Sequence, residues 1–413
     1  MYCFILITAL FMMNSCNSSN KSEEISVLYM AQAGYQPEEI RKIADDFEKE
    51  SGIQVKIEFV KYDEQHKKIV KSANLEVPNY DIFSLDLIWT AEFAENKYCV
   101  DLTDKVKDFS KEIAPAIIDA FRYKDKIWAM PFLANFQLLF FNKKYIQKAG
   151  FTEAPKTLEE MVDQMRIMKS KGIVEYPFID SWNPKEGLVC EFVWLTAAFG
   201  GETFNDSGEP IFNKGPGLKA LQFMVMLLDE GLANPLSLNC DEAMAKDIFI
   251  SGQASFTSNW TFQYALMNNP SISKVYGEAD TGLLPVSKSI IQKYKHDTAS
   301  VSGFQGLGIM NNSPHKEAAW KYINFITSPE IQKAHLEEMP IWNSVQMDET
   351  VKKNDPIMDI KAKQIASVHH RPKVVNYTKI SSIMQQYIHA ALSKKINPSD
   401  ALTKAADEIK TIK

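Results

Sequence analysis

The pattern of apolar and polar positions in the first part of the chain predicts alternating strands and helices. Residues 25–30 form a short apolar run typical of a buried strand, and a helical pattern follows from Pro37 to Gly52. Residues 53–60 alternate between apolar and polar side chains, which predicts a second strand. A helical pattern over 63–75 and a buried strand over 81–85 come next. This order predicts a parallel sheet flanked by helices.

The remaining pattern is mainly helical, with a few strands. We expect strands at 127–131, 137–142, 254–257, 283–285 and 306–310. We expect helices at 157–171, 191–199, 217–230, 241–251, 314–327, 329–338 and 380–413, the last interrupted at Asn397-Pro398. Thr157 precedes two glutamates and is the expected N-cap of its helix. The strands at 283–285 and 306–310 are expected to rejoin the first sheet, so a domain built from separate pieces of chain is predicted.

The N-terminus has the character of a targeting segment. Residues 4–13 are apolar, about half the length that spans a bilayer, and a polar stretch follows Cys16. This arrangement resembles a bacterial lipoprotein signal, in which the cysteine is cleaved and lipidated. The resemblance implies a signal peptide over 1–15, lipidation at Cys16 and a flexible tether over 16–25. A plain signal peptide or an N-terminal strand is the alternative.

Composition narrows the class of protein. The 413 residues carry a formal net charge of −6 and no block of lysine and arginine, which argues against nucleic acid as a partner. The length favours two domains. Cys99, Cys190 and Cys240 are widely spaced, which is not the pattern of a disulfide framework. No metal-ligand spacing occurs, so we expect neither a metal site nor a cofactor.

An ordered set of motifs resembles the family 1 extracellular solute-binding proteins, the maltose- and trehalose-binding type that serves ABC importers. The matching stretches are 80–95, 128–131 with 138–144, 149–160, 249–254 leading to Trp260, 328–332, and Arg371-Pro372 with Tyr377 and Ser381. Each motif alone is weak. Together, in the family's order, they cover nearly the whole chain from about residue 26 to 410.

The resemblance implies an α/β, two-lobed periplasmic-binding-protein fold of type II, with a mostly parallel sheet in each lobe and a ligand cleft between the lobes. We expect residues 26–133 and 284–328 in the first lobe, and 134–283 and 329–413 in the second. It implies a monomer that captures a sugar or oligosaccharide and delivers it to the permease subunits of an ABC transporter. The protein would be exported and held by its lipid on the periplasmic or outer-surface side of a bacterial membrane.

Candidate ligand-binding residues are polar or aromatic side chains that follow predicted strands, because ligands of such sheets bind beyond the carboxyl ends of strands. Asp86 and Trp89 follow the strand at 81–85, although a helix N-cap and a core aromatic are the alternatives. Asn135 lies where the family often has a carboxylate, or else in a plain turn. Gln32 and Gln36 follow the first strand.

The other candidates depend more on the resemblance. The family places a sugar-stacking tryptophan where Trp260 stands, at the expected junction of a strand and a helix, and core packing is the alternative. Phe304 or Gln305 occupies the aromatic position of a family loop. Arg371 could hold a pair of hydroxyl groups or form a structural ion pair. Trp182, in a polar loop, could form a platform at the rim of the cleft.

Two other classes of function remain open on the sequence alone. No nucleophile elbow, zinc-protease motif or phosphate-binding loop occurs, so we expect no catalytic residue and no enzyme. A binding protein for a non-sugar solute, such as a peptide, a polyamine or a chelate, is the nearer alternative. A secreted glycoside hydrolase is the more distant one, because a sequence does not show how far apart its carboxylates lie.

Overall fold

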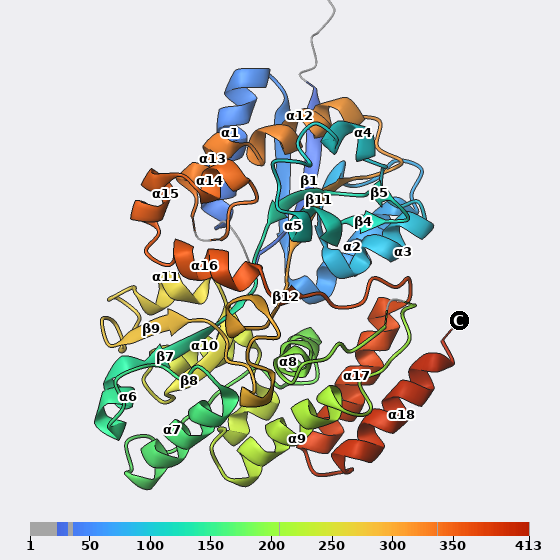
Figure 1. The fold of residues 1–413 in the computed structure, drawn as a ribbon. Helices are drawn as coiled ribbons and strands as arrows, with labels where there is room; N and C mark the ends of the chain where they lie inside the picture. The colour runs from blue at the N-terminus through green and yellow to red at the C-terminus, as the bar shows by residue number, and fades with distance from the viewer. Residues whose placement is uncertain (1–22, 32–35, 206, 337, 413) are drawn as a thin grey trace, which may run out of the picture.

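The computed structural model describes residues 23–31, 36–205, 207–336 and 338–412. The expected signal peptide, Cys16 and Gln32 lie outside the described residues. The chain folds into two lobes stacked one above the other, with β12 (Val368–His369) at the waist between them (Figure 1). In the part of the chain that the structure describes, no helix has the length and apolar character needed to cross a membrane.

The first lobe is built on a five-stranded sheet with the strand order β2-β1-β3-β11-β6. Its strands are β1 (Glu24–Met30), β2 (Gln54–Val60), β3 (Ile82–Asp86), β6 (Met130–Leu133) and β11 (Gln305–Ile309), and β4 (Arg122–Tyr123) and β5 (Lys126–Ile127) form a small hairpin. The helices around it are α1 (Pro37–Ser51), α2 (Tyr62–Ala73), α3 (Thr90–Glu95), α4 (Thr103–Val106), α5 (Pro115–Ala120), α12 (Lys316–Ile326), α13 (Pro329–Ala334), α14 (Asn343–Gln346) and α15 (Glu349–Asn354).

The second lobe surrounds a three-stranded sheet with the order β8-β7-β9. The three strands are β7 (Gln137–Asn142), β8 (Phe256–Trp260) and β9 (Ala279–Gly282), and the short β10 (Ser300–Val301) lies outside this sheet and pairs with β12. Its helices are α6 (Lys143–Ala149), α7 (Leu158–Ser170), α8 (Glu186–Ala198), α9 (Pro216–Asp229), α10 (Glu242–Ile250), α11 (Gln263–Met267), α17 (Tyr377–Leu392) and α18 (Pro398–Lys410), with the 3₁₀ turn η2 (Pro235–Asn239). Helix α16 (Met358–Ile365) leads into β12 at the waist.

Three stretches of chain cross between the lobes and hydrogen-bond to one another. They are residues 134–136, between β6 and β7, residues 302–304, between β10 and β11, and residues 368–371, which include β12. The backbone N–H of Gly303 donates to the carbonyl of Asn135 (2.9 Å), and that of Ser302 donates to the carbonyl of His369 (3.1 Å). β10 also pairs with β12 in parallel. The crossing segments therefore form one hydrogen-bonded hinge region.

The two-lobed α/β fold is confirmed, but the sheets differ from the expected mostly parallel arrangement. In the first lobe β1 pairs in parallel with β2 and β3, whereas β11 pairs antiparallel with β3 and β6. In the second lobe both β8 and β9 pair antiparallel with β7. A strand shows the same alternation of apolar residues whether it pairs in parallel or antiparallel. The pairing direction depends instead on the side from which the preceding segment of chain enters the sheet.

Two stretches lie in a different lobe from the one we expected. Residues 284–301 pack in the second-lobe core, where Leu284, Val286 and Val301 are buried, and the expected strand at 283–285 does not form. Helices α13 to α15 pack on the first lobe instead. There, Trp342 donates from its indole nitrogen to the carbonyl of Thr327 (2.6 Å) and stacks edge-on against Phe109. Apolar runs indicate burial without indicating which core they join.

Candidate ligand-binding site between the lobes

The crossing segments bring several of the expected ligand-binding residues together at the waist. Asp86 ends β3 in the first lobe, and Gln305 at the start of β11 is its partner across the sheet. Asn135 and Phe304 lie on the first and second crossing segments, and Arg371 lies on the third. The sequence places these residues up to 285 positions apart. Only the return of the chain to the waist makes them neighbours.

Arg371 joins the two lobes through a buried ion network. Its Nη2 donates to Oδ1 of Asp86 in the first lobe (3.1 Å), and its Nη1 donates to Oε1 of Glu186 in the second (2.8 Å). The arginine and aspartate side chains are 2% and 7% exposed, so the pairs are largely shielded from water. Both carboxylates have further partners. Charges buried in this way are stable only when such hydrogen bonds compensate for their lost hydration.

Two phenols and a hydroxyl complete this network. Tyr62, the first residue of α2, donates to Oδ2 of Asp86 (2.8 Å). Tyr377 and Ser381 on α17 donate to the two oxygens of Glu186 (both 2.5 Å). Burial raises the pKa of Tyr62 and Tyr377 well above the ordinary value, so both phenols remain protonated donors. The waist thus presents an arginine, two carboxylates and three hydroxyl groups within one network.

Trp260 lies beside this network, at the end of β8, and is partly exposed. Its indole packs against the second crossing segment: a Cβ added at Gly303 would lie 2.7 Å from Cζ3 of Trp260 and 3.1 Å from Oδ1 of Asn135. A side chain at 303 would therefore displace one of them. Oδ1 of Asn135 is buried and has no hydrogen-bond partner among the described residues. A partly open indole and an unused amide oxygen thus lie side by side.

Glu242, the first residue of α10, supplies a carboxyl group to the same place. The Trp260 side chain hydrogen-bonds to it, and its Oε1 would lie 2.8 Å from a Cβ added at Gly187. Gly187 is the second residue of α8, so the missing side chain lets the carboxyl approach the start of that helix. Burial raises the pKa of Glu242 above its ordinary value in spite of the indole hydrogen bond.

Other expected site residues lie away from any opening. Trp89 is 3% exposed and stacks on Tyr62 (ring centroids 5.5 Å apart) within an aromatic group that includes His66 and Phe93. Trp182 is fully buried and packs against Phe178 in the second-lobe core. Both tryptophans therefore pack as core residues here.

The remaining expected residues have mainly structural contacts. Phe304 is fully buried with its ring edge-on to His370, and Gln305 contacts Sδ of Met30 from Nε2 (3.7 Å). Gln36 is exposed at the N-cap of α1, where its backbone N–H donates to the carboxylate of Glu39 (2.8 Å). Asp86 also caps the 3₁₀ turn that follows it by accepting from the N–H of Ile88. Asp86 therefore has both roles: it caps the turn, as the alternative interpretation expected, and it belongs to the ion network of Arg371.

Tyr62, Glu186 and Glu242 are not among the site residues expected from the sequence. A signal was present for Tyr62, because it directly follows β2, whose carboxyl end faces the same edge of the parallel pair as that of β3. Glu186 and Glu242 each open a helix, and carboxylates in the first turn are common simply because they stabilise the helix. Nothing in their sequence context separates them from other such residues.

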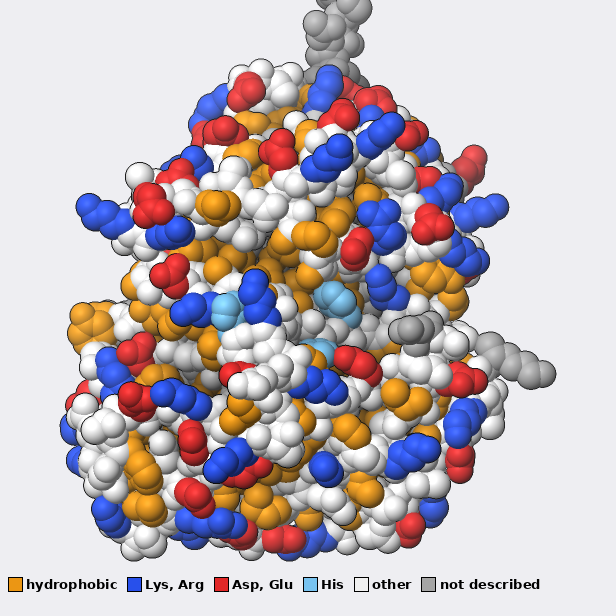
Figure 2. Space-filling model, viewed as in Figure 1, with side chains coloured by type: hydrophobic (Ala, Val, Ile, Leu, Met, Phe, Trp, Pro, Cys, Tyr) orange, Lys and Arg blue, Asp and Glu red, His pale blue; other side chains and the backbone are white. Residues whose placement is uncertain are grey.

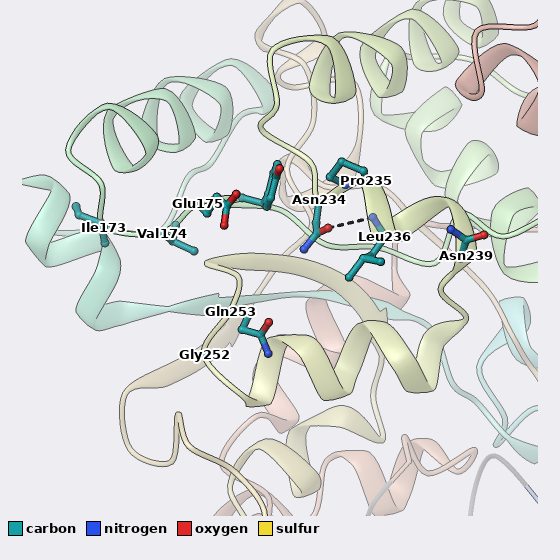
Figure 3. Close-up of a pocket in the computed structure, with 10 residues that line it drawn as sticks. Ile173, Val174, Glu175, Asn234, Pro235, Leu236, Asn239, Gly252 and Gln253 are labelled. Atoms are coloured by element: carbon teal, nitrogen blue, oxygen red, sulfur yellow. Dashed lines mark hydrogen bonds between the residues drawn. The ribbon is translucent and has the colours of Figure 1, made fainter.

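The surface of the second lobe has a hollow that lies away from the crossing segments. Figure 2 shows acidic and basic side chains interspersed over both lobes on the viewed face, so this face carries no large field of one sign. A cavity of about 720 Å³ lies in the second lobe, lined by residues of 173–176, 234–236 and 252–253 and by Asn239. In Figure 3 the side-chain oxygen of Asn234 accepts the backbone N–H of Leu236 at its edge. Among the residues that the structure describes, those lining this hollow all belong to the second lobe.

Comparison with known proteins identifies a family and several similar proteins. The family model described as bacterial extracellular solute-binding protein matches residues 33–333. A protein of Sinorhizobium fredii, named probable amino-acid ABC transporter periplasmic-binding protein y4oP, is 26% identical over 73% of this chain and 68% of its own length. The maltotriose-binding protein of Pyrococcus abyssi is 25% identical over 67% of this chain and 58% of its own length.

A solved structure extends the similarity to the whole fold. The maltose-bound MalE3 of T. maritima superposes with a TM-score of 0.84 at 28% identity, and the match covers 94% of this chain and all of that one. The two lobes and the three crossing segments described above are consistent with that relationship, as is the group of polar side chains at the waist. The chain belongs to the bacterial extracellular solute-binding protein family and is a solute-binding protein of the ABC-transporter type.

Proposed function

We propose that this protein captures a sugar or oligosaccharide between its lobes and delivers it to the membrane permease of an ABC importer. The observation that carries the proposal is the group formed by Trp260, Asn135 and Glu242. A sugar presents flat C–H faces to aromatic rings and hydroxyl groups to amides and carboxylates. An indole with part of its surface open, next to an unused amide oxygen and a carboxyl group, matches both kinds of contact.

The ion network of Arg371 fits the same proposal. A guanidinium between two carboxylates, with phenols around it, offers donors and acceptors to several hydroxyl groups at once. These groups come from both lobes, so a ligand that replaced part of the network would contact both lobes together. Such contacts would bias the hinge toward a closed arrangement.

The names of the relatives support a sugar and also leave a second candidate. MalE3 is described as maltose-bound, and the Pyrococcus abyssi relative is named for maltotriose. The Sinorhizobium fredii relative is named for amino acids, which favours a small non-sugar solute as the alternative. An amino acid would need partners for an ammonium and a carboxylate group. Glu186 could pair with the ammonium group and Arg371 with the carboxylate. These two residues, however, already form an ion pair with each other.

A thermal-shift screen distinguishes these candidates. The purified protein is heated with maltose, maltotriose, other mono- and oligosaccharides, and the common amino acids. A ligand that binds only the folded state stabilises it by about 2.7 kcal/mol at a hundred times its Kd, which raises the Tm. We expect a shift with at least one saccharide and none with amino acids. A shift with amino acids alone would replace the sugar proposal, and intact ligand after incubation would argue against the hydrolase alternative.

We also propose that the mature protein is a monomer anchored to the membrane through Cys16. The support is the short apolar run that ends before Cys16 and the polar stretch after it. A fatty-acid probe added to cells should label the wild-type protein and not Cys16→Ser. Equal labelling of both proteins would refute the anchor, and uptake of the screened sugar by cells lacking this protein would refute the proposed delivery to a permease.

A further inference from the structure

A buried polar network lies inside the second lobe, separate from the ion network of Arg371. Oγ of Ser258 on β8 is 2.7 Å from Oδ2 of Asp180 and 2.7 Å from Oε2 of Glu191 on α8. Gln137 donates to Oε1 of Glu191 (2.5 Å), and the indole of Trp194 donates to its Oε2 (2.6 Å). All five side chains are buried, with at most 2% exposed.

The hydrogens available in this network favour a proton on one of the two carboxyl groups. A serine hydroxyl has a single hydrogen, so Ser258 donates to only one of the two carboxyl groups. The other contact, at 2.7 Å, is attractive only if the carboxyl itself donates to the serine oxygen. Glu191 already accepts from Gln137 and Trp194, as an ionised carboxylate does. Asp180 accepts from the N–H of Ser181 through Oδ1, and its carboxyl group also contacts that of Glu191, so a proton on Oδ2 would make its contacts with both Ser258 and Glu191 favourable.

This network supports the second-lobe side of the candidate site. Gln137 follows Asn135 by two positions at the start of β7, and Ser258 precedes Trp260 by two positions at the end of β8. The two strands pair directly, with Gln137 opposite Trp260. Ser300, just before the second crossing segment, donates from Oγ to the carbonyl of Gln137 (2.7 Å). The network therefore ties α8 to β8, which carries Trp260, and to β7, which begins two residues after Asn135.

We propose that Asp180 is held as a neutral carboxylic acid at neutral pH, and that the hydrogen bonds from Asp180 through Ser258 to Glu191 position β8, which carries Trp260, and β7, which begins two residues after Asn135. Asp180, Ser258 and Glu191 are positioning residues in this arrangement. Their protonation and geometry are properties of the protein alone, whereas their effect on ligand binding rests on the proposed function. If Asp180 is protonated, two negative charges are not buried next to each other. The proton also fixes the direction of both hydrogen bonds, from Asp180 to Ser258 and from Ser258 to Glu191.

The surroundings of Asp180 and Glu191 agree with a proton on Asp180. Burial raises the pKa of Asp180 well above its ordinary value, and the neighbouring Glu191 raises it further. Burial also raises the pKa of Glu191, against its hydrogen bonds. Other titratable or charged groups on the elements packed against the pair include Glu186 and Cys190 on α8, Cys240 directly after η2, and Glu242, Lys246 and Asp247 on α10. Tyr377 on α17 and His369, His370 and Arg371 on the third crossing segment face α8 from the other side.

Infrared spectroscopy of the protein without ligand tests the protonation directly. A neutral carboxyl absorbs separately from carboxylates, so difference spectra at neutral pH show which side chain carries the proton. We expect this band in the wild type and in Glu191→Gln, and its loss in Asp180→Asn. Asp163→Asn, which changes a carboxylate that is 69% exposed, is the control and should leave the band unchanged. Absence of the band in the wild type, or its loss only in Glu191→Gln, would overturn the assignment.

Thermal unfolding tests the positioning role. Asp180→Asn keeps a hydrogen-bond donor toward Ser258 and should have nearly the wild-type Tm at neutral pH. Asp180→Ala loses the hydrogen bond to Ser258 and should have a lower Tm. A carboxyl whose pKa is raised by folding binds more protons in the folded state, so its stabilisation declines as pH rises toward that pKa. From about pH 7 to about pH 10 the wild-type Tm should therefore fall by ~2 °C or more relative to Asp180→Asn. Equal Tm values for Asp180→Ala and Asp180→Asn, or a constant gap over this range, would contradict the proposal.

Discussion

Trp182 and Trp260 show how far the role of one residue type depends on its neighbours. Trp182 is fully buried against Phe178, whereas Trp260 keeps part of its ring open beside Asn135. A buried indole contributes mainly to the stability of the fold, because its removal leaves a cavity. A partly open indole contributes less to stability and can contribute to ligand binding. These two residues therefore form a matched pair for separating the two effects.

Replacing Trp260 by alanine should weaken sugar binding by about 1–3 kcal/mol, roughly 5- to 150-fold in Kd, because the aromatic surface for the ligand is lost. The Tm without ligand should change little. Trp182→Ala should instead lower the free energy of unfolding by about 3–5 kcal/mol. Calorimetric titration with the sugar from the screen and thermal unfolding measure both quantities. A large loss of stability in Trp260→Ala with unchanged affinity would show that this tryptophan is a core residue.

His370 is a buried titratable group in the hinge region. Its Nδ1 lies 2.6 Å from Oγ of Ser302, which links the second and third crossing segments. Burial, with the positive charges of Lys373, His369 and Arg371 nearby, lowers the pKa of His370 to about 4, and Glu202 opposes this effect. The unfolded chain binds a proton near pH 6.5 and the folded chain does not, so stability is complete above that pH and is lost as pH falls toward 4.

We therefore expect the wild-type Tm to fall more between about pH 7 and about pH 5 than the Tm of His370→Asn. Asparagine places a polar atom near the position of Nδ1 but does not titrate. His315→Asn, a histidine outside the crossing segments, is the control and should follow the wild type. Parallel pH profiles for His370→Asn and the wild type would show that His370 does not set this dependence.

At the scale of elements, helix starts are fixed by short local patterns. The Oγ1 of Thr157 accepts the backbone N–H of Glu160 (3.1 Å) and begins α7, as expected from the sequence. Asp241 caps α10 in the same way by accepting from the N–H of Met244 (3.0 Å). Each of these contacts joins residues only three positions apart. Local sequence is therefore enough to determine them.

Removing the cap of α7 should cost a predictable amount of stability. Thr157→Ala leaves a helix N–H without its partner and should lower the free energy of unfolding by about 1 kcal/mol. Thr157→Ser keeps the oxygen and should lie close to the wild type. Urea unfolding of the three proteins gives the comparison, and an equal loss in Thr157→Ser would indicate that the methyl group, and not the cap, is the important part.

At the scale of the whole molecule, the Arg371 network links the two lobes electrostatically. Asp86 belongs to the first lobe and Glu186 to the second, and Arg371 holds both carboxylates. Lys185 and Asp63 form a second contact between α2 and the residue before α8 (3.0 Å), but it is exposed and adds little. The buried arginine is therefore the more important electrostatic link.

Replacing Arg371 by glutamine should leave the buried carboxylate of Asp86 and the partly buried carboxylate of Glu186 without their shared counter-charge. Removing one partner of a buried ion pair typically costs about 3–5 kcal/mol, and here the lobes can relieve the cost by separating. We expect a larger radius of gyration for Arg371→Gln than for the wild type in small-angle X-ray scattering. The double variant Asp86→Asn with Arg371→Gln removes one of the charges and should recover part of the compact form. An unchanged radius in Arg371→Gln would show that other contacts hold the lobes together.

The sequence by itself determined the features that depend on near neighbours. The periodic patterns located most helices and strands, Thr157 was identifiable as a cap, and the ordered motifs indicated the two-lobed fold. Asp86, Asn135, Trp260 and Arg371, which the structure gathers at the waist, could also be selected from the sequence, because they follow strands or match family motifs.

The tertiary structure alone decided the features that depend on distant parts of the chain. Pairing directions, the lobe joined by residues 284–301, the burial of Trp182 and the partnership of Arg371 with Glu186 all arise from contacts that no local pattern encodes. An apolar run has the same alternation in either core, and a carboxylate at a helix start looks the same whether it faces water or an arginine. The core that an apolar run joins, and the partner that a carboxylate finds, depend on how the three crossing segments bring distant parts of the chain together.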